Sequence, residues 1–257
     1  MTLLEVEGLS KSFGGVTAIA DLCFKVPEQQ VYSVIGPNGA GKTTLFNMLS
    51  GIYTPNEGSI KFQNRELIGR LPHQVASLGV SRTFQNLQMF FNMSVLDNVK
   101  VGCHLRTRSR IWSAALRLPG IFREERQAEA WSREALEFCR LEEFIGQEAS
   151  ALPYGVLKRL EIARALAAKP SLLLMDEPAA GLNDTETVEM RQLIRRICAS
   201  GVTVLLVEHN MGLVMDVSDR ILVIDYGSRL AEGTPTEIQR NPKVIQAYLG
   251  GEVQYAV

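Results

Sequence analysis

Short runs of apolar and β-branched residues alternate along the chain with amphipathic helical patterns. Four of these runs have the length of a buried strand, at 31–36, 171–176, 202–208 and 220–225. Between the second and third runs, apolar residues recur at helical spacing, at Met190, Leu193, Ile194, Ile197 and Cys198. Gly201 then supplies a helix stop. A strand–helix–strand unit of this kind predicts a parallel sheet flanked by helices, and therefore an α/β fold.

The middle third of the chain, from about residue 90 to residue 150, lacks strand-like runs. Charged helical sequence replaces them, with apolar residues at helical spacing at Ala128, Trp131, Ala135 and Phe138. We therefore expect a helical lobe inserted into the α/β core. Four arginines of this lobe could contact a partner or lipid headgroups, although a solvated face is the favoured interpretation; they are Arg106, Arg108, Arg110 and Arg117.

The composition is that of a folded protein, since 46% of the 257 residues are hydrophobic and 21% are charged. This length fits one large domain, or one domain that carries a smaller inserted lobe. The formal net charge of −1 creates no global field that would favour nucleic acid as the main partner. The four cysteines lie far apart, without the paired spacing of a zinc or redox site. Free buried thiols in a reducing compartment are therefore expected.

Neither a targeting segment nor a membrane span is visible in the sequence. The first residues include Glu5 and Glu7 and lack the basic start and apolar run of a signal peptide. No stretch approaches the ~20 apolar residues that a membrane-spanning helix needs. We expect the protein in the cytosol or on the cytosolic side of a membrane.

Residues 36–44, GPNGAGKTT, fit the phosphate-loop pattern G-x-x-x-x-G-K-[ST]. Glycines let the backbone approach phosphate closely, and the N–H groups of residues 38–43 would form an anion nest at a helix N-terminus. Lys42 would add positive charge at the β- and γ-phosphates. Thr43 offers a hard oxygen ligand to Mg²⁺, and Thr44 can bond a further phosphate oxygen. The candidate binding residues are Gly36, Pro37, Asn38, Gly39, Ala40, Gly41, Lys42, Thr43 and Thr44.

A match to this pattern should arise by chance in roughly one chain in a hundred of this length. Here the loop also lies between a predicted strand and a predicted helix that Gly51 ends. The sequence therefore predicts a nucleotide-binding site, while the kind of nucleotide enzyme stays open at this point.

Asp176 and Glu177 leave the end of the apolar run 171–176 together. Two carboxylates at the end of a buried strand are costly unless a cation or a reacting water uses them. Because a phosphate loop lies upstream, we expect Asp176 to hold Mg²⁺ and Glu177 to act as general base on the attacking water. A helix cap would be the ordinary interpretation of such a pair on its own.

The order of these features resembles that of the ABC ATPases over nearly the whole chain. After the phosphate loop come Gln85, LPYGV at 152–156, the acidic pair and His209. LPYGV stands where the family has its LSGGQ signature, and KRLEIARAL follows it as a similar helix does in the family. The resemblance implies a P-loop NTPase (RecA-like) core, an inserted α-helical signature subdomain and an N-terminal antiparallel β region.

The resemblance also implies how the chain is divided. A single ABC ATP-binding domain would span 1–257, with its nucleotide-binding core at 1–86 and 156–240. The helical subdomain would occupy 87–155 and end in the signature segment, and 241–257 would form a short C-terminal tail.

Four further residues receive a role from the resemblance alone. Phe13 would stack on the adenine, and Gln85 would contact Mg²⁺ and the attacking water and couple the site to the membrane partner. Gly155 would cap the γ-phosphate bound by the opposite subunit, and His209 would contact the γ-phosphate. Taken singly, a core phenylalanine, a surface glutamine and a structural histidine would be the plainer interpretations.

The signature segment departs from the family pattern at three positions. Pro153 and Tyr154 replace the usual Ser and Gly, and Val156 replaces the usual Gln. A proline there also suits related importer subunits, so the change is not taken as inactivation. In the segment AGLN, Asn183 stands where Asp is common, and this position is expected to serve the dimer interface.

Within the family, the chain most resembles the ATP-binding subunits of branched-chain (hydrophobic) amino-acid uptake systems. LPYG with RLEIARAL, DEPAAGLN and NPKVIQAYLGG carry this resemblance. It implies ATP and Mg²⁺ at the site, and a second ABC ATPase subunit, identical or homologous, across an ATP sandwich. It also implies transmembrane permease subunits, indirectly a substrate-binding protein, and a peripheral position on the cytoplasmic face of the membrane, with the isolated chain soluble.

Several alternatives stay open at the level of the sequence. The ATPase of lipopolysaccharide export and urea or amide importers are close rivals inside the family. From other classes, a GTPase would need an Asn-Lys-x-Asp motif, which is missing, and a kinase would not need LPYGV or His209. A non-transport ABC ATPase would usually carry two nucleotide domains or a long coiled-coil insertion.

Overall fold

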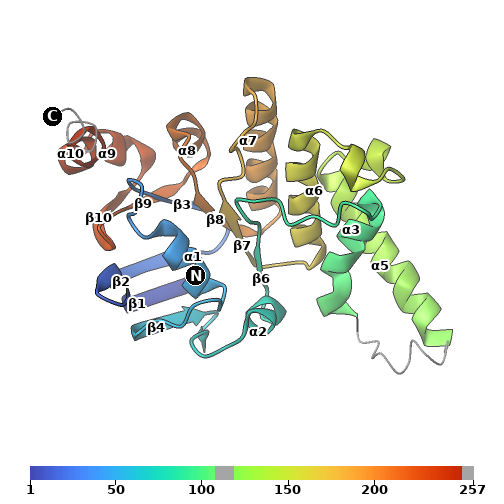
Figure 1. Ribbon diagram of the computed structural model, residues 1–257, viewed down its shortest axis with the longest axis horizontal. Helices are drawn as coiled ribbons and strands as arrows, with labels where there is room; N and C mark the ends of the chain where they lie inside the picture. Colours follow the sequence, from blue (N-terminus) through green and yellow to red (C-terminus); the bar gives the residue numbers. More distant parts are fainter. Residues whose placement is uncertain (108–118, 251–257) are drawn as a thin grey trace.

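The computed structural model describes residues 1–107 and 119–250 (Figure 1). Arg108, Arg110 and Arg117 lie outside the described residues, as does the part of the expected tail at 251–257. Within the described part, no helix is long and apolar enough to cross a membrane.

The larger sheet has six strands in the order β10-β9-β3-β8-β7-β6. Its parallel strands are β3 (Val31–Ile35), β6 (Val80–Arg82), β7 (Leu172–Asp176), β8 (Thr203–Val207) and β9 (Arg220–Asp225). Only β10 (Ser228–Gly233) runs antiparallel to its neighbour. The four apolar runs of the sequence thus become the parallel strands β3, β7, β8 and β9, as predicted.

A smaller antiparallel sheet is built from two strands that precede β3 and two strands that follow α1. It has the order β2-β1-β4-β5 and consists of β1 (Thr2–Phe13), β2 (Val16–Pro27), β4 (Glu57–Phe62) and β5 (Arg65–Glu66). This sheet is the expected N-terminal antiparallel region, so the expected fold class is confirmed.

Nine α-helices are described in residues 1–107 and 119–250. They are α1 (Lys42–Leu49), α2 (Pro72–Ser77), α3 (Val95–Gly102), α5 (Pro119–Phe138), α6 (Tyr154–Ala167), α7 (Asp184–Ala199), α8 (Met211–Val217), α9 (Pro235–Gln239) and α10 (Pro242–Gly250). Helices α3, α5 and α6 pack on one another and form the lobe at one end of the molecule, far from α9 and α10 (Figure 1). The helix that follows the signature segment, α6, is therefore packed as part of this lobe.

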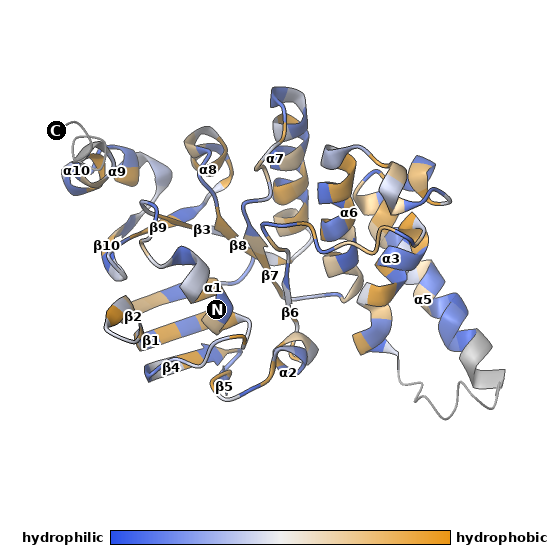
Figure 2. Cartoon of the chain, in the orientation of Figure 1, coloured by the Kyte–Doolittle hydropathy of each residue, from blue (hydrophilic) through white to orange (hydrophobic). Residues whose placement is uncertain are grey.

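The core lies on both faces of the larger sheet. Side chains alternate along a strand, so Leu172 and Leu174 of β7 face one apolar cluster with α1, and Leu173 and Met175 face another with α6 and α7. Figure 2 shows apolar residues along the strands of the larger sheet and mostly hydrophilic residues along α5. The expected helical face of α7 is buried at Met190, Leu193, Ile194 and Ile197.

The four cysteines are free thiols, as expected. Cys103 and Cys139 are buried and Cys198 is half-buried, whereas Cys23 is exposed, so the expectation of burial is wrong for that one residue. Cys23 lies on β2, where strand side chains alternate between the core and solvent.

Candidate functional site

The phosphate loop connects β3 to α1, and its shape depends on two glycines. Gly41 has φ of 102° and precedes α1 without any side-chain cap, so the first N–H groups of α1 are not covered by a side chain. A Cβ at Gly41 would lie 2.4 Å from the carbonyl oxygen of Ala18, and one at Gly36 would lie 2.1 Å from that of Ile224. Only glycine fits either position, and the loop is thereby held against β2 and β9.

Lys42 is the buried cation of this loop, with 7% of the residue exposed. Its Nζ donates to the carbonyl oxygens of Gly36, at 2.6 Å, and Pro37, at 2.9 Å. Burial lowers the pKa of Lys42, and the charges of Glu177 and Asp176 oppose that shift. The acidic pair is therefore within electrostatic reach of the loop. Around Lys42, Asn38, Gly39 and Thr43 are exposed and Pro37, Gly41 and Thr44 are half-buried, while Ala40 is buried.

Asp176 ends β7 with only 5% of the residue exposed. Its Oδ2 forms an ion pair with Nη2 of Arg82 at 3.0 Å. Burial raises the pKa of the Asp176 carboxyl, and the hydrogen bond and charge of Arg82 act in the opposite direction. Arg82 is a site residue that sequence reasoning missed, because it stands in no motif and meets Asp176 only through the pairing of β6 with β7.

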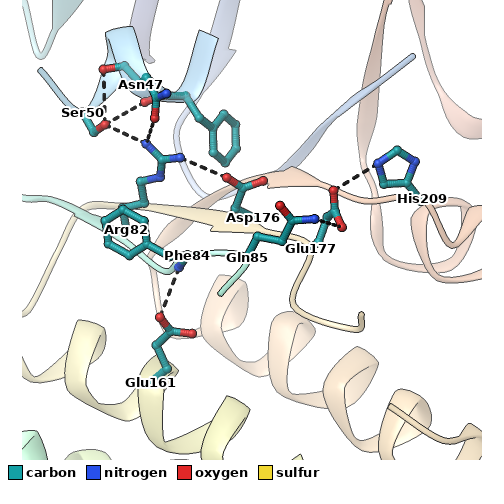
Figure 3. A network of polar contacts seen from close by, with 10 residues as sticks. Asn47, Ser50, Arg82, Phe84, Gln85, Glu161, Asp176, Glu177 and His209 are labelled. Atoms are coloured by element: carbon teal, nitrogen blue, oxygen red, sulfur yellow. Dashed lines mark hydrogen bonds and ion pairs between the residues drawn. The ribbon is translucent and has the colours of Figure 1, made fainter. Parts of the chain in front are cut away.

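Glu177 lies between two other expected site residues (Figure 3). Its Oε2 accepts a hydrogen bond from Nε2 of Gln85 at 2.9 Å, and its Oε1 lies 3.1 Å from Nε2 of His209. The backbone at Glu177 has φ of 49°, an uncommon value for a residue with a side chain, and its N–H donates to Val207 of β8. Strained backbone of this kind persists where the surroundings hold it, and here Gln85 and His209 hold the side chain of Glu177.

Glu208 is a second residue that sequence reasoning missed. It is 3% exposed and accepts backbone hydrogen bonds from Ala179 at 2.7 Å, His209 at 2.9 Å and Asn210 at 3.2 Å. The carboxylate thus ties the loop after β7 to the loop after β8. A glutamate directly after the apolar run TVLLV was the available signal, because a buried carboxylate needs partners.

The segment around Gln85 is also tied to the signature helix α6. Nζ of Lys158 donates to the carbonyl oxygen of Gln85 at 3.0 Å, and the N–H of Phe84 donates to Oε1 of Glu161 at 3.2 Å. Lys158 and Glu161 are each 2% exposed. Burial raises the pKa of Glu161, although these contacts oppose the shift. Movement of the helical lobe would therefore pull directly on Gln85.

Phe13 and Gly155 lie apart from this cluster. Phe13, at the end of β1, is 44% exposed, contacts Tyr53 edge to face at 5.3 Å and carries Nζ of Lys11 5.1 Å above its ring. Gly155 is buried in the first turn of α6, against the side chain of Glu186. In the described residues neither makes a hydrogen bond or ring contact with the phosphate loop.

The departures from the signature pattern have local structural reasons. Val156 is 7% exposed and belongs to the apolar core of the helical lobe. The side chain of Asn183 caps α7: its oxygen accepts from the N–H of Glu186 at 2.9 Å, while the backbone N–H of Asn183 donates to the Glu186 carboxylate at 3.0 Å. Within this chain Asn183 therefore serves as a helix cap.

Comparisons with known proteins agree with this geometry. A family model described as ABC transporter matches residues 19–180, and one described as branched-chain amino acid ATP-binding cassette transporter matches residues 228–254. The high-affinity branched-chain amino acid transport ATP-binding protein BraF of Pseudomonas aeruginosa is 46% identical over 249 residues, which cover 96% of this chain and 98% of BraF. The lipopolysaccharide export system ATP-binding protein LptB of Acidithiobacillus ferridurans is 34% identical, covering 98% of both chains.

A solved structure shares the fold over nearly its whole length. The ADP conformation of MJ1267, an ATP-binding cassette of an ABC transporter, aligns with a TM-score of 0.85 at 31% identity and covers 97% of this chain and 99% of its own. The strands and helices that carry Lys42, Asp176 and Glu177 thus belong to a fold shared with an ATP-binding cassette in its ADP conformation.

Proposed function

Because this chain belongs to the ABC transporter family as one of its ATP-hydrolysing subunits, we propose that it powers the uptake of branched-chain amino acids. It would do so through separate transmembrane permease subunits, from the cytoplasmic face of the membrane. The observation that carries the substrate class is the match of residues 228–254 to the branched-chain amino acid cassette model. The 46% identity to BraF, against 34% to LptB, points in the same direction.

ATP would bind across the phosphate loop. Lys42 now donates to two carbonyl oxygens of its own loop, and the β- and γ-phosphate oxygens would replace them as stronger acceptors. The uncapped first turn of α1 and the Thr44 hydroxyl would supply further donors. Phe13, which is 44% exposed, would stack on the adenine.

The residues at the site fit a magnesium ion. The Thr43 hydroxyl, the Asp176 carboxylate and the Gln85 amide oxygen are hard oxygen donors, which Mg²⁺ prefers. Arg82 uses only Oδ2 of Asp176, and Gln85 uses only its nitrogen toward Glu177. When bound, Mg²⁺ would neutralise charge on the β- and γ-phosphates.

Glu177 would act as the general base of hydrolysis. Gln85 and His209 hold one oxygen each of its carboxylate, so its orientation is set before nucleotide arrives. The carboxylate would accept a proton from the attacking water. His209, with 47% of its side chain exposed, can turn toward the γ-phosphate.

Gly155 would act on the nucleotide of a second ABC ATPase subunit. It lies in the first turn of α6 against Glu186, and the neighbouring Tyr154 is 43% exposed. A second subunit, identical or homologous, would complete the site, so ATP would stabilise the closed pair and hydrolysis would release it.

A groove between the core and the helical lobe is suited to a permease segment. Its lining combines apolar and charged residues: Ile52, Val75, Arg82, Phe84, Leu105 and Arg164. A segment in this groove would contact Arg82, which holds Asp176, and Phe84, which directly precedes Gln85, the residue that holds Glu177. A substrate-binding protein would then act on the permease and reach this chain only indirectly.

The test is to isolate the complex from the native host and identify its subunits. Two permease subunits, a second ATPase and a leucine-binding protein are expected, with ATP-dependent leucine uptake after reconstitution. Copurification of a protein that bridges to the outer membrane would indicate lipopolysaccharide export in place of amino-acid uptake. Transport of urea without leucine would refute the proposed substrate class, and copurification of ribosomes or DNA without a permease would refute transport.

A further inference from the structure

Arg82 is held by three polar side chains and two aromatic rings. Its Nη1 donates to Oδ1 of Asn47 at 2.7 Å and to Oγ of Ser50 at 2.9 Å, and its Nη2 donates to Oδ2 of Asp176 at 3.0 Å. The guanidinium also lies over the rings of Phe46, at 5.6 Å, and Phe84, at 4.9 Å. Figure 3 shows the guanidinium between Asp176 and the end of α1 that carries Asn47 and Ser50.

The pairing of two strands explains why Arg82 reaches Asp176. Arg82 is opposite Leu174 in the parallel ladder of β6 and β7. Asp176 lies two residues after Leu174 and therefore faces the same side of the sheet as Leu174 and Arg82. That side is covered by α1, whose Asn47 and Ser50 hold the other half of the guanidinium. A side chain from the sheet edge thus bridges the strand that carries Asp176 to the helix that follows the phosphate loop.

This ion pair leaves one carboxylate oxygen available. Only Oδ2 of Asp176 contacts Arg82, and Oδ1 accepts no hydrogen bond from the described residues. The side chains of Arg82 and Asp176 are 7% and 6% exposed, so water competes little for the contact. Arg82 therefore fixes the orientation of the Asp176 carboxylate, and with it the position of Oδ1.

We propose that Arg82 is a positioning residue for the magnesium site, which holds the Asp176 carboxylate so that its free oxygen serves the metal. This inference rests on the proposed role of Asp176. A partner that orients a metal-binding carboxylate commonly changes metal affinity or activity ~10–100-fold when it is removed. Arg82 would act on the metal through Asp176 without contacting nucleotide, which separates its effect from that of Lys42.

The experiment compares the full chain with Arg82→Met, Arg82→Lys and Asn47→Ala. Binding of ADP is titrated in EDTA and then at rising Mg²⁺, and the Mg²⁺ concentration for half-maximal hydrolysis of ATP is measured in parallel. Arg82→Met should raise both half-saturating Mg²⁺ concentrations ~10-fold while ADP affinity in EDTA stays within about twofold of wild type. Arg82→Lys keeps the charge but cannot bridge to α1 as a planar fork does, so a smaller rise is expected.

Asn47→Ala keeps the arginine and removes one anchor of its guanidinium, so a rise of a few-fold in the same direction is expected even if Arg82→Met does not fold. Arg191→Met is the control, because Arg191 also forms an arginine–aspartate ion pair, with Asp216 at 2.6 Å between α7 and α8, although that pair is more exposed, at 37% and 50%. An unchanged Mg²⁺ requirement in the folded Arg82 and Asn47 variants would overturn the inference. Equal losses of ADP affinity with and without Mg²⁺ would also overturn it, by showing a merely structural role. If the wild-type chain assembled with its second ATPase subunit and permease showed no Mg²⁺-dependent hydrolysis of ATP, the proposed function would be refuted instead.

Discussion

The carboxylate of Glu208 accepts a hydrogen bond from the backbone N–H of Ala179 at 2.7 Å, although the two residues are 29 positions apart. Ala179 follows the acidic pair at the end of β7, and Glu208 follows the end of β8. The contact therefore fixes the loop of Glu177 relative to the loop of His209, the two residues whose side chains meet at 3.1 Å.

Replacing Glu208 by alanine should destabilise the protein. The N–H of the buried Ala179 and those of the exposed His209 and Asn210 would lose their acceptor, which should lower the free energy of unfolding by about 3 kcal/mol. Glu208→Gln keeps one acceptor oxygen and should cost less. Urea unfolding followed by circular dichroism measures the change, with Glu129→Ala on the outer face of α5 as control. A Glu208→Ala protein as stable as this control would show that the two loops do not depend on the carboxylate.

Replacing Glu177 by glutamine should separate ATP binding from hydrolysis. The amide keeps the size of the side chain but cannot accept the proton of the attacking water, so turnover should fall ~10²–10⁴-fold. ATP should still bind, and an ATP-bound pair of subunits should accumulate. Size-exclusion chromatography with light-scattering detection measures this pair. Glu129→Gln should leave both properties unchanged. Turnover near the wild-type rate in Glu177→Gln would overturn the assignment of the general base.

Replacing Gly155 by alanine should weaken the start of α7. The added Cβ would lie 2.3 Å from Oε1 of Glu186, so Glu186 must move and its hydrogen bonds with Asn183 are strained. Loss of a capping box of this kind costs about 1 kcal/mol, which should lower Tm by a few degrees.

Gly146→Ala is the matched control for that substitution, because a Cβ at Gly146 would meet nothing within 4 Å. Differential scanning calorimetry of the two variants should therefore show a lower Tm for Gly155→Ala alone. Equal melting temperatures would mean that Glu186 can move away from the added methyl group without a loss of stability.

Glu161→Gln should change how stability depends on pH. Burial raises the pKa of Glu161 above its ordinary value of 4.5, so the folded protein binds this proton more tightly than the unfolded chain. Wild-type stability should then lose a contribution as pH rises from about 4.5 through the raised pKa. Because the amide oxygen can still accept from Phe84, the variant should gain stability relative to wild type between acid and neutral pH.

Urea unfolding at several pH values between 4.5 and 8 measures this difference. Lys158 and Arg164, whose charges favour the ionised carboxylate, stay in place in both proteins. Parallel curves for the two proteins would contradict the raised pKa.

The sequence alone determined the features whose physical cause is local. An apolar run such as 202–208 can only be buried, and its length and β-branched residues make it a strand. The phosphate loop was equally readable, because its glycines, Lys42 and Thr43 are contiguous and carry their chemistry on one turn. Asp176 and Glu177 were candidates because two carboxylates at the end of a buried strand are costly without a partner.

The tertiary structure alone decided which distant side chains share one partner. Arg82 and Asp176 are 94 positions apart, and only the pairing of β6 with β7 brings them together. Val156 and Asn183 depart from the family pattern in the sequence, and packing gives each a role within the chain, the first as a core residue and the second as a helix cap. Strand order and helix packing determine which distant residues become neighbours in the fold. The sequence shows a site directly only where the residues that form it are close together in the chain.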